Sequence, residues 1–235
     1  MLNNNFIALV ITFALSLIWL RIMDFAAQRG WISGHLSRKI IHIGTGPLFV
    51  ICWLLFNSDP IARWLAALVP LAITAQFVMV GLGLMKDEAA VKAMSRNGDR
   101  REILKGPLFY GLVFVVLTLI FWKDSPVGIT ALMLLCGGDG LAEILGRRFG
   151  QARLPWSKGK SYVGSLGMFA GGWILAALVL GVYAWAGVFP LPWTSYLLPL
   201  TLVAIGGTVV ESLPVKDVDN LTVAVAAVVL GLLLF

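Results

Sequence analysis

Asp139, Glu143 and Arg147 are spaced four residues apart at the end of an apolar stretch. On a helix, this spacing places the three side chains in one stripe. A pair of carboxylates in this position can hold a divalent metal, and hard oxygen ligands suit Mg²⁺, which also binds nucleotide phosphates. Charged groups embedded in an apolar span are costly and usually functional. The stripe therefore predicts a metal site with Asp139 and Glu143 as ligands.

A basic segment rich in glycine follows this stripe directly. Glycine allows the backbone to approach a ligand closely, and clustered bases bind polyphosphates. Basic loops are also common in membrane proteins for reasons of topology, so the spacing alone leaves both interpretations open. The neighbouring acids favour a phosphate site. The bases concerned are Arg147, Arg148, Lys158 and Lys160.

Two further charged clusters could serve the same site. Glu211, Asp217 and Asp219 lie close together near residues 206–223, although Asp219 could simply cap a helix. Arg38 and Lys39 precede His42 at the start of another apolar stretch. The two bases could instead extend to the membrane surface, and His42 could be an ordinary interior histidine. Asp217 and Asp219 are predicted as metal ligands with Asp139 and Glu143.

The elements that must position these residues are membrane helices. Of the 235 residues, 59% are hydrophobic and 13% charged, which excludes a soluble domain of this length. We expect an all-α bundle of about eight transmembrane spans in a single domain, 1–235. The apolar stretches cover approximately 5–22, 40–57, 61–85, 106–122, 126–145, 163–187, 195–212 and 218–235.

The distribution of basic residues predicts the topology. Sixteen of the 18 Lys and Arg residues belong to the loops after the first, third, fifth and seventh spans. The positive-inside rule places these loops in the cytoplasm and both termini on the opposite side. The net charge of +6 thus reflects topology, and no nucleic-acid partner is expected.

At these residues the chain resembles the polyprenol kinase family, which includes phytol kinase, farnesol kinase and dolichol kinase. The resemblance extends from about Arg38 to Asn220, and within the family it is greatest to phytol kinase. Four segments carry it: RKIIHIGTG at 38–46, GDGLAEILGRRFG at 138–150, LPWSKGKSYVGS at 154–165 and ESLPVKDVDNLT at 211–222.

The resemblance implies an enzyme that phosphorylates an isoprenoid alcohol, phytol or else geranylgeraniol or farnesol, to its monophosphate. It implies CTP as donor, with UTP as an alternative, and Mg²⁺ as cofactor. Asp139, His42 and Glu211 are the predicted catalytic residues. The predicted nucleotide-binding residues are Arg38, Lys39, Gly146, Arg147, Gly150, Lys158, Lys160, Ser161, Gly164 and Ser165.

Plant members of that family carry an organelle transit peptide, and the N-terminus of this chain has no such character. We therefore expect a bacterial inner or thylakoid membrane, with a cyanobacterium as one source, and the active site on its cytoplasmic face. Alternatives are a phosphatidate cytidylyltransferase-like enzyme, which would release pyrophosphate instead of CDP, a small membrane transporter, and a scaffold protein. A transporter favours charges near the bilayer midplane, whereas these lie at span ends.

Overall fold

The computed structural model describes residues 4–95, 98–215 and 218–235. The chain forms two compact units, Met1–Leu119 and Ile120–Phe235, and each is described by itself. The expected single domain stays a prediction. Both units are built from helices, which confirms the expected all-α class.

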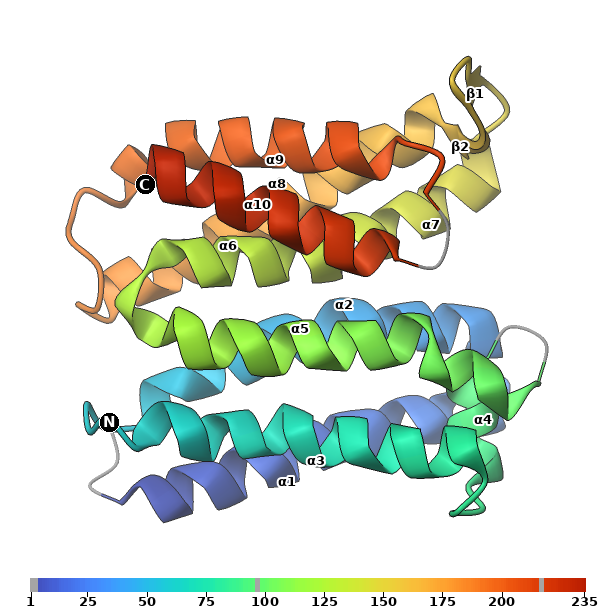
Figure 1. Ribbon diagram of the computed structural model, residues 1–235, viewed down its shortest axis with the longest axis horizontal. Helices are drawn as coiled ribbons and strands as arrows, with labels where there is room; N and C mark the ends of the chain where they lie inside the picture. Colours follow the sequence, from blue (N-terminus) through green and yellow to red (C-terminus); the bar gives the residue numbers. More distant parts are fainter. Residues whose placement is uncertain (1–3, 96–97, 216–217) are drawn as a thin grey trace. The chain divides into compact units, whose positions relative to one another are not determined.

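Unit 1 is a bundle of long apolar helices joined by short turns. Ser33 begins one of them by accepting a hydrogen bond from the backbone N–H of Leu36 at 3.2 Å. Gly83 ends another in a left-handed conformation (φ +80°), which costs glycine little. The elements are α1 (Asn5–Gln28), α2 (Gly34–Cys52), η1 (Trp53–Leu55), α3 (Ala62–Leu82), α4 (Glu88–Met94), η2 (Arg100–Leu104) and α5 (Gly106–Ile120) (Figure 1).

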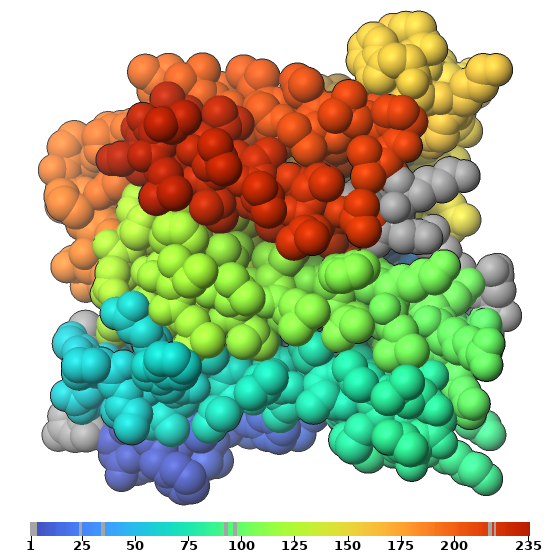
Figure 2. Space-filling model, in the orientation of Figure 1, coloured from blue at the N-terminus to red at the C-terminus, as the bar shows by residue number. Residues whose placement is uncertain are grey.

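Unit 2 combines packed helices with a small hairpin that projects beyond the helix ends (Figures 1 and 2). Helices α9 and α10 pack side by side, and α8 packs against α7. The elements are η3 (Trp122–Asp124), α6 (Pro126–Met133), η4 (Leu134–Gly138), α7 (Asp139–Phe149), β1 (Arg153–Leu154), β2 (Ser157–Ser161), α8 (Tyr162–Trp185), η5 (Trp193–Tyr196), α9 (Leu197–Glu211) and α10 (Asp219–Leu234).

The helix running through α6, η4 and α7 forms the buried centre of unit 2. It extends from Pro126 to Phe149, and most of its length is buried. Glycines bring it close to α8, as small residues do at helix interfaces in membranes. A Cβ at Gly171 would collide with the carbonyl oxygen of Gly137, and a Cβ at Gly167 would lie 2.9 Å from that of Leu141. The backbones of the two helices therefore nearly touch.

Seven helices in the described parts of the chain are long and apolar enough to cross a membrane. The eighth expected span forms α10, an apolar helix of 16 residues. At about 1.5 Å per residue it is shorter than a hydrocarbon layer of about 30 Å. The protein is thus a polytopic membrane protein, and its described residues include seven helices of span length and one shorter apolar helix. The side on which each terminus lies stays a prediction.

Candidate active site

The acidic stripe predicted from the sequence lies on α7. Asp139 begins this helix, and both Asp139 and Glu143 are half-buried. The guanidinium of Arg147 lies 3.8 Å from Glu143 Oε1, which confirms the predicted spacing on one helical face. The preceding residues, Leu134–Gly138, form a π-helical turn. Such turns rotate the residues that follow them and are frequent at functional sites.

The basic segment after α7 forms a β-hairpin, which the sequence analysis treated as a loop. Leu154 pairs with Ser157, and Arg153 pairs with Ser161. Leu154, Ser157 and Ser161 are buried, whereas Arg153 and Lys158 are exposed. One face of the hairpin therefore packs on the protein, and the other presents bases to solvent. The strands are too short for alternating hydrophobicity to reveal them in the sequence.

Four of the predicted nucleotide-binding residues pack against one another where the hairpin meets α7 and α8. Ser161 Oγ accepts a hydrogen bond from the backbone N–H of Gly164 at 3.1 Å and thereby caps α8. A Cβ at Gly150 would lie 2.5 Å from Ser161 Oγ, and one at Gly146 would lie 3.5 Å from Gly164 Cα. Close packing thus explains why glycine occupies these positions. Contact of these residues with a nucleotide stays a prediction.

Two contacts fasten the hairpin to the end of α9. The ammonium of Lys160 contacts Glu211 Oε1, 51 residues away in sequence. The side chain of Glu211 is only 6% exposed and that of Lys160 24%. The indole N–H of Trp156 donates to Ser212 Oγ at 3.2 Å. The structure therefore brings together two predicted site residues, Lys160 and Glu211, and adds Trp156 and Ser212, which the sequence analysis did not assign.

Ser165 lies one turn into α8. Its Oγ is buried and has no hydrogen-bond partner among the described residues. Gly164 packs against Ala142 and Gly138 packs against Met168, so this turn of α8 runs beside the turn of α7 that carries Asp139 and Glu143. A buried hydroxyl without a partner usually awaits a water, an ion or a ligand.

The remaining predicted bases and the histidine lie in unit 1, on α2. Lys39 is buried and Arg38 is half-buried. The hydroxyl of Tyr110, on α5, donates to the backbone carbonyl of His42 at 2.9 Å, and the two rings lie 4.3 Å apart. Tyr110 thus fixes His42, and nothing in the local sequence pattern pointed to it. That these residues belong to the same site as those of unit 2 stays a prediction.

Asp217, one of the expected metal ligands, and the side chain of Asp219, another, are not among the parts that the structure describes. Asp219 is described only as the first residue of α10. Among the described residues, Asp139 and Glu143 included, no group of three or more His, Cys, Asp or Glu side chains comes together as a metal site. The convergence of Asp139, Lys160 and Asp217 therefore stays a prediction.

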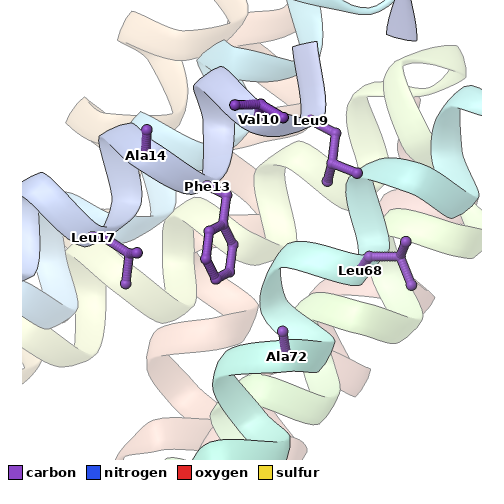
Figure 3. A pocket seen from close by; sticks show the side chains of 7 residues that line it. All are labelled: Leu9, Val10, Phe13, Ala14, Leu17, Leu68 and Ala72. Carbon is purple, nitrogen blue, oxygen red and sulfur yellow. The ribbon is translucent and has the colours of Figure 1, made fainter. Parts of the chain in front are cut away.

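Unit 1 also contains an apolar groove, between α1 and α3 (Figure 3). Its volume is about 440 Å³. None of the lining residues is titratable, so the groove holds no acid–base chemistry, and a hydrocarbon chain is the kind of molecule that fits it. The lining residues are Leu9, Val10, Phe13, Ala14, Leu17, Leu68 and Ala72.

Comparison with known proteins gives relatives along most of the chain. A probable phytol kinase of Triticum aestivum is 44% identical over 217 residues, which are 92% of this chain and 72% of that protein. A probable phytol kinase 1 of Oryza sativa subsp. japonica is 44% identical over 217 residues, 92% of this chain and 69% of that protein. Phytol kinase 1 of Arabidopsis thaliana is 39% identical over 210 residues, 88% and 69% of the two chains.

These three relatives are described as chloroplastic plant proteins. They support a kinase and lend no support to the bacterial origin expected from the sequence. No protein-family model matches the chain, and no solved structure matches it.

Proposed function

The chain belongs to the phytol kinase family, and we propose that it transfers the γ-phosphoryl group of CTP to phytol. Family membership makes it an alcohol phosphotransferase that acts on an isoprenoid alcohol. CTP, with UTP as an alternative, and phytol, before geranylgeraniol and farnesol, are the proposed substrates. The observation that carries the proposal is the similarity to phytol kinases along about nine-tenths of the chain.

In the proposed reaction the alcohol oxygen forms a bond to the γ-phosphorus. The bond from that phosphorus to the bridging β–γ oxygen breaks, CDP leaves, and the hydroxyl proton passes to a base. Such a transfer depends chiefly on positioning and on neutralising charge. Lys158, Lys160 and Arg147 are proposed to neutralise the phosphate oxygens. The exposure of Lys158 and Arg147 and the fixed position of Lys160 support these roles.

Asp139 and Glu143 fit a site for Mg²⁺, with Asp217 or Asp219 as proposed additional ligands. Mg²⁺ commonly takes one or two carboxylates and completes its shell with water and substrate phosphates, so this small set suffices. The buried hydroxyl of Ser165, beside the same turn of α7, is a further oxygen of the kind such a site uses. When bound, the metal would offset the negative charge of the triphosphate.

The general base has three candidates: His42, Glu143 and Glu211. Two of these candidates, Glu143 and Glu211, lie in unit 2. Glu211 is the less suited of them, because its carboxylate already accepts a hydrogen bond from the Lys160 ammonium. We therefore propose that Glu211 positions Lys160. The proton then passes to His42, or to Glu143 in a site where Glu143 does not hold the metal.

The isoprenoid tail is proposed to lie between helices in the hydrocarbon layer, with its hydroxyl at the membrane surface. Because positive charge favours the cytoplasmic side, the basic hairpin and its site are proposed to face the cytoplasm or the equivalent compartment. A thylakoid membrane fits the chloroplast location of the relatives, and a bacterial inner membrane is supported only by the sequence. Roles in tocopherol biosynthesis and in salvage of phytol from chlorophyll would follow.

The test uses membranes from cells that express the full chain, incubated with labelled CTP and a panel of phytol, geranylgeraniol, farnesol and dolichol. Formation of a labelled monophosphate of phytol together with CDP is the expected result. Release of pyrophosphate would instead indicate a cytidylyltransferase, and no transfer to any alcohol would overturn the proposal. Membranes from cells with an empty vector give the background.

A further inference from the structure

Trp156 combines a fixed position with an exposed ring. It lies in the turn of the hairpin, between β1 and β2, and 55% of its surface is exposed. Its indole N–H donates to Ser212 Oγ at 3.2 Å, and the Ser212 hydroxyl in turn donates to the carbonyl of Val209 at 2.7 Å. The Ser212 hydroxyl is thereby oriented to accept from the indole. The single polar group of Trp156 is satisfied, while much of its aromatic surface faces outward.

The cation predicted to bind phosphate is fastened to the same end of α9 as this ring. Lys160 lies four residues after Trp156 in the same hairpin and contacts Glu211, the residue before Ser212. Adjacent residues have Cα atoms about 3.8 Å apart, so the indole and the ammonium are anchored to consecutive residues at the end of α9. A flat aromatic surface beside a cation matches a nucleotide, which has a flat base and a negatively charged phosphate chain.

We propose that Trp156 stacks on the nucleobase of the phosphoryl donor and that Ser212 holds its ring in place. This rests on the proposed function, since it assumes a nucleoside triphosphate as donor. Stacking on an aromatic side chain stabilises a bound base whatever its identity, because every base has a π face. Trp156 therefore contributes to nucleotide affinity, and the discrimination among bases belongs to other groups.

The competing role for Trp156 is a membrane anchor, because tryptophan is enriched at membrane surfaces. Phe149 and Tyr162, on either side of the hairpin, are also exposed aromatic residues. Within the hairpin, however, the apolar Leu154 points inward and the exposed Arg153 and Lys158 are charged. An anchor would also leave the indole N–H for the lipid headgroups, whereas here Ser212 accepts it. These observations favour stacking on a nucleobase over anchoring in the membrane surface.

The experiment measures binding of labelled CTP to the purified full chain in lipid nanodiscs, with inorganic triphosphate as a competitor that has no base. Trp156→Leu keeps an apolar side chain but removes the ring. We expect it to weaken CTP binding about 10-fold, and to leave competition by inorganic triphosphate unchanged. Trp156→Phe keeps a ring and should bind CTP nearly as the wild type does. Ser212→Ala, which frees the indole, should give an intermediate loss.

Several results would overturn the inference. They are unchanged CTP binding by Trp156→Leu, an equal loss for CTP and inorganic triphosphate, and a wild type that binds no nucleotide. A membrane anchor predicts a raised KM for the alcohol with unchanged CTP binding, which would also reject stacking. Because binding is measured without turnover, a wild type that binds CTP but phosphorylates no alcohol would reject only the proposed function.

Discussion

Lys160 on the hairpin and Glu211 at the end of α9 form an ion pair between residues that are 51 positions apart in sequence. Glu211 is almost fully buried, so its charge has lost most of its contact with water. Such a charge is stable only beside a partner, because desolvation penalises the charged form. The pair therefore fixes the hairpin, and with it the basic residues that we assign to phosphate binding.

A double-mutant cycle tests the energy of this pair. Lys160→Met, Glu211→Gln and the double variant should show a coupling of about 1–2 kcal/mol in the free energy of unfolding, because the pair is largely buried. The measurement is unfolding of the purified protein in detergent. The control is the Glu143–Arg147 pair, whose N–O distance is 3.8 Å and whose arginine is largely exposed. The coupling energy of this control pair should be about 0.5 kcal/mol or less. Equal coupling in the two pairs would contradict the conclusion that the Lys160–Glu211 pair fixes the hairpin.

Asp139 is expected to be essential for activity and dispensable for folding. Asp139→Asn keeps the shape of the side chain but removes the charge, and should lower kinase activity at least about 100-fold, as loss of a key electrostatic contact does. Its elution in size-exclusion chromatography should match the wild type. Asp124→Asn, on η3 before the same buried helix, is the matched control because Asp124 is exposed and has no assigned role. Normal turnover by Asp139→Asn would remove Asp139 from the mechanism.

Close packing of η4 and α7 on α8 makes a prediction that concerns the fold alone. Gly171→Ala should destabilise the protein by about 1–3 kcal/mol, because the new methyl group would collide with the backbone of Gly137. Gly181→Ala, in the same helix, is the control, since no described atom lies within 4 Å of its Cβ position. There alanine should be neutral or stabilise by up to about 1 kcal/mol. Similar thermal stability of the Gly171→Ala and Gly181→Ala variants would show that α8 can move away from the Gly137 backbone at little cost.

The helices were the most predictable part of this protein, because a membrane span is recognised from a continuous run of apolar residues. The stretch expected at 163–187 forms α8, Tyr162–Trp185, and that expected at 61–85 forms α3, Ala62–Leu82. The spacing of Glu143 and Arg147 was also sufficient, since residues four apart meet on any helix. Such features depend only on neighbours in the sequence.

The contacts that complete the site depend on neighbours in space and could not be predicted in this way. Trp156 meets Ser212 across 56 residues, and Tyr110 meets His42 across 68. The hairpin was also missed, because β1 has only two residues and the five residues of β2 carry lysine and glycine where alternating apolar residues would mark a strand. The π-helical turn before Asp139 has no signal in local composition, apart from the paired Gly137 and Gly138.

Substitution of Ser165 is expected to change stability and activity in opposite directions. Its buried hydroxyl has no partner among the described residues, and an unsatisfied buried polar group costs about 1–3 kcal/mol. If a phosphate or metal-bound water fills that need during catalysis, Ser165→Ala should unfold at a higher temperature than the wild type yet phosphorylate more slowly, with a higher KM for CTP. Both quantities are measured on the same purified sample.

Thr130 is the matched control for Ser165. Its Oγ1, on α6, is likewise buried without a hydrogen-bond partner in the described chain, and it has no assigned role. Thr130→Val preserves the shape and should stabilise the protein while activity stays at the wild-type level. Raised stability with normal activity in both variants would mean that Ser165 is only a packing defect. Lower stability of Ser165→Ala would instead mean that its hydroxyl is satisfied within the folded protein, because removing an unsatisfied group cannot cost stability in that way.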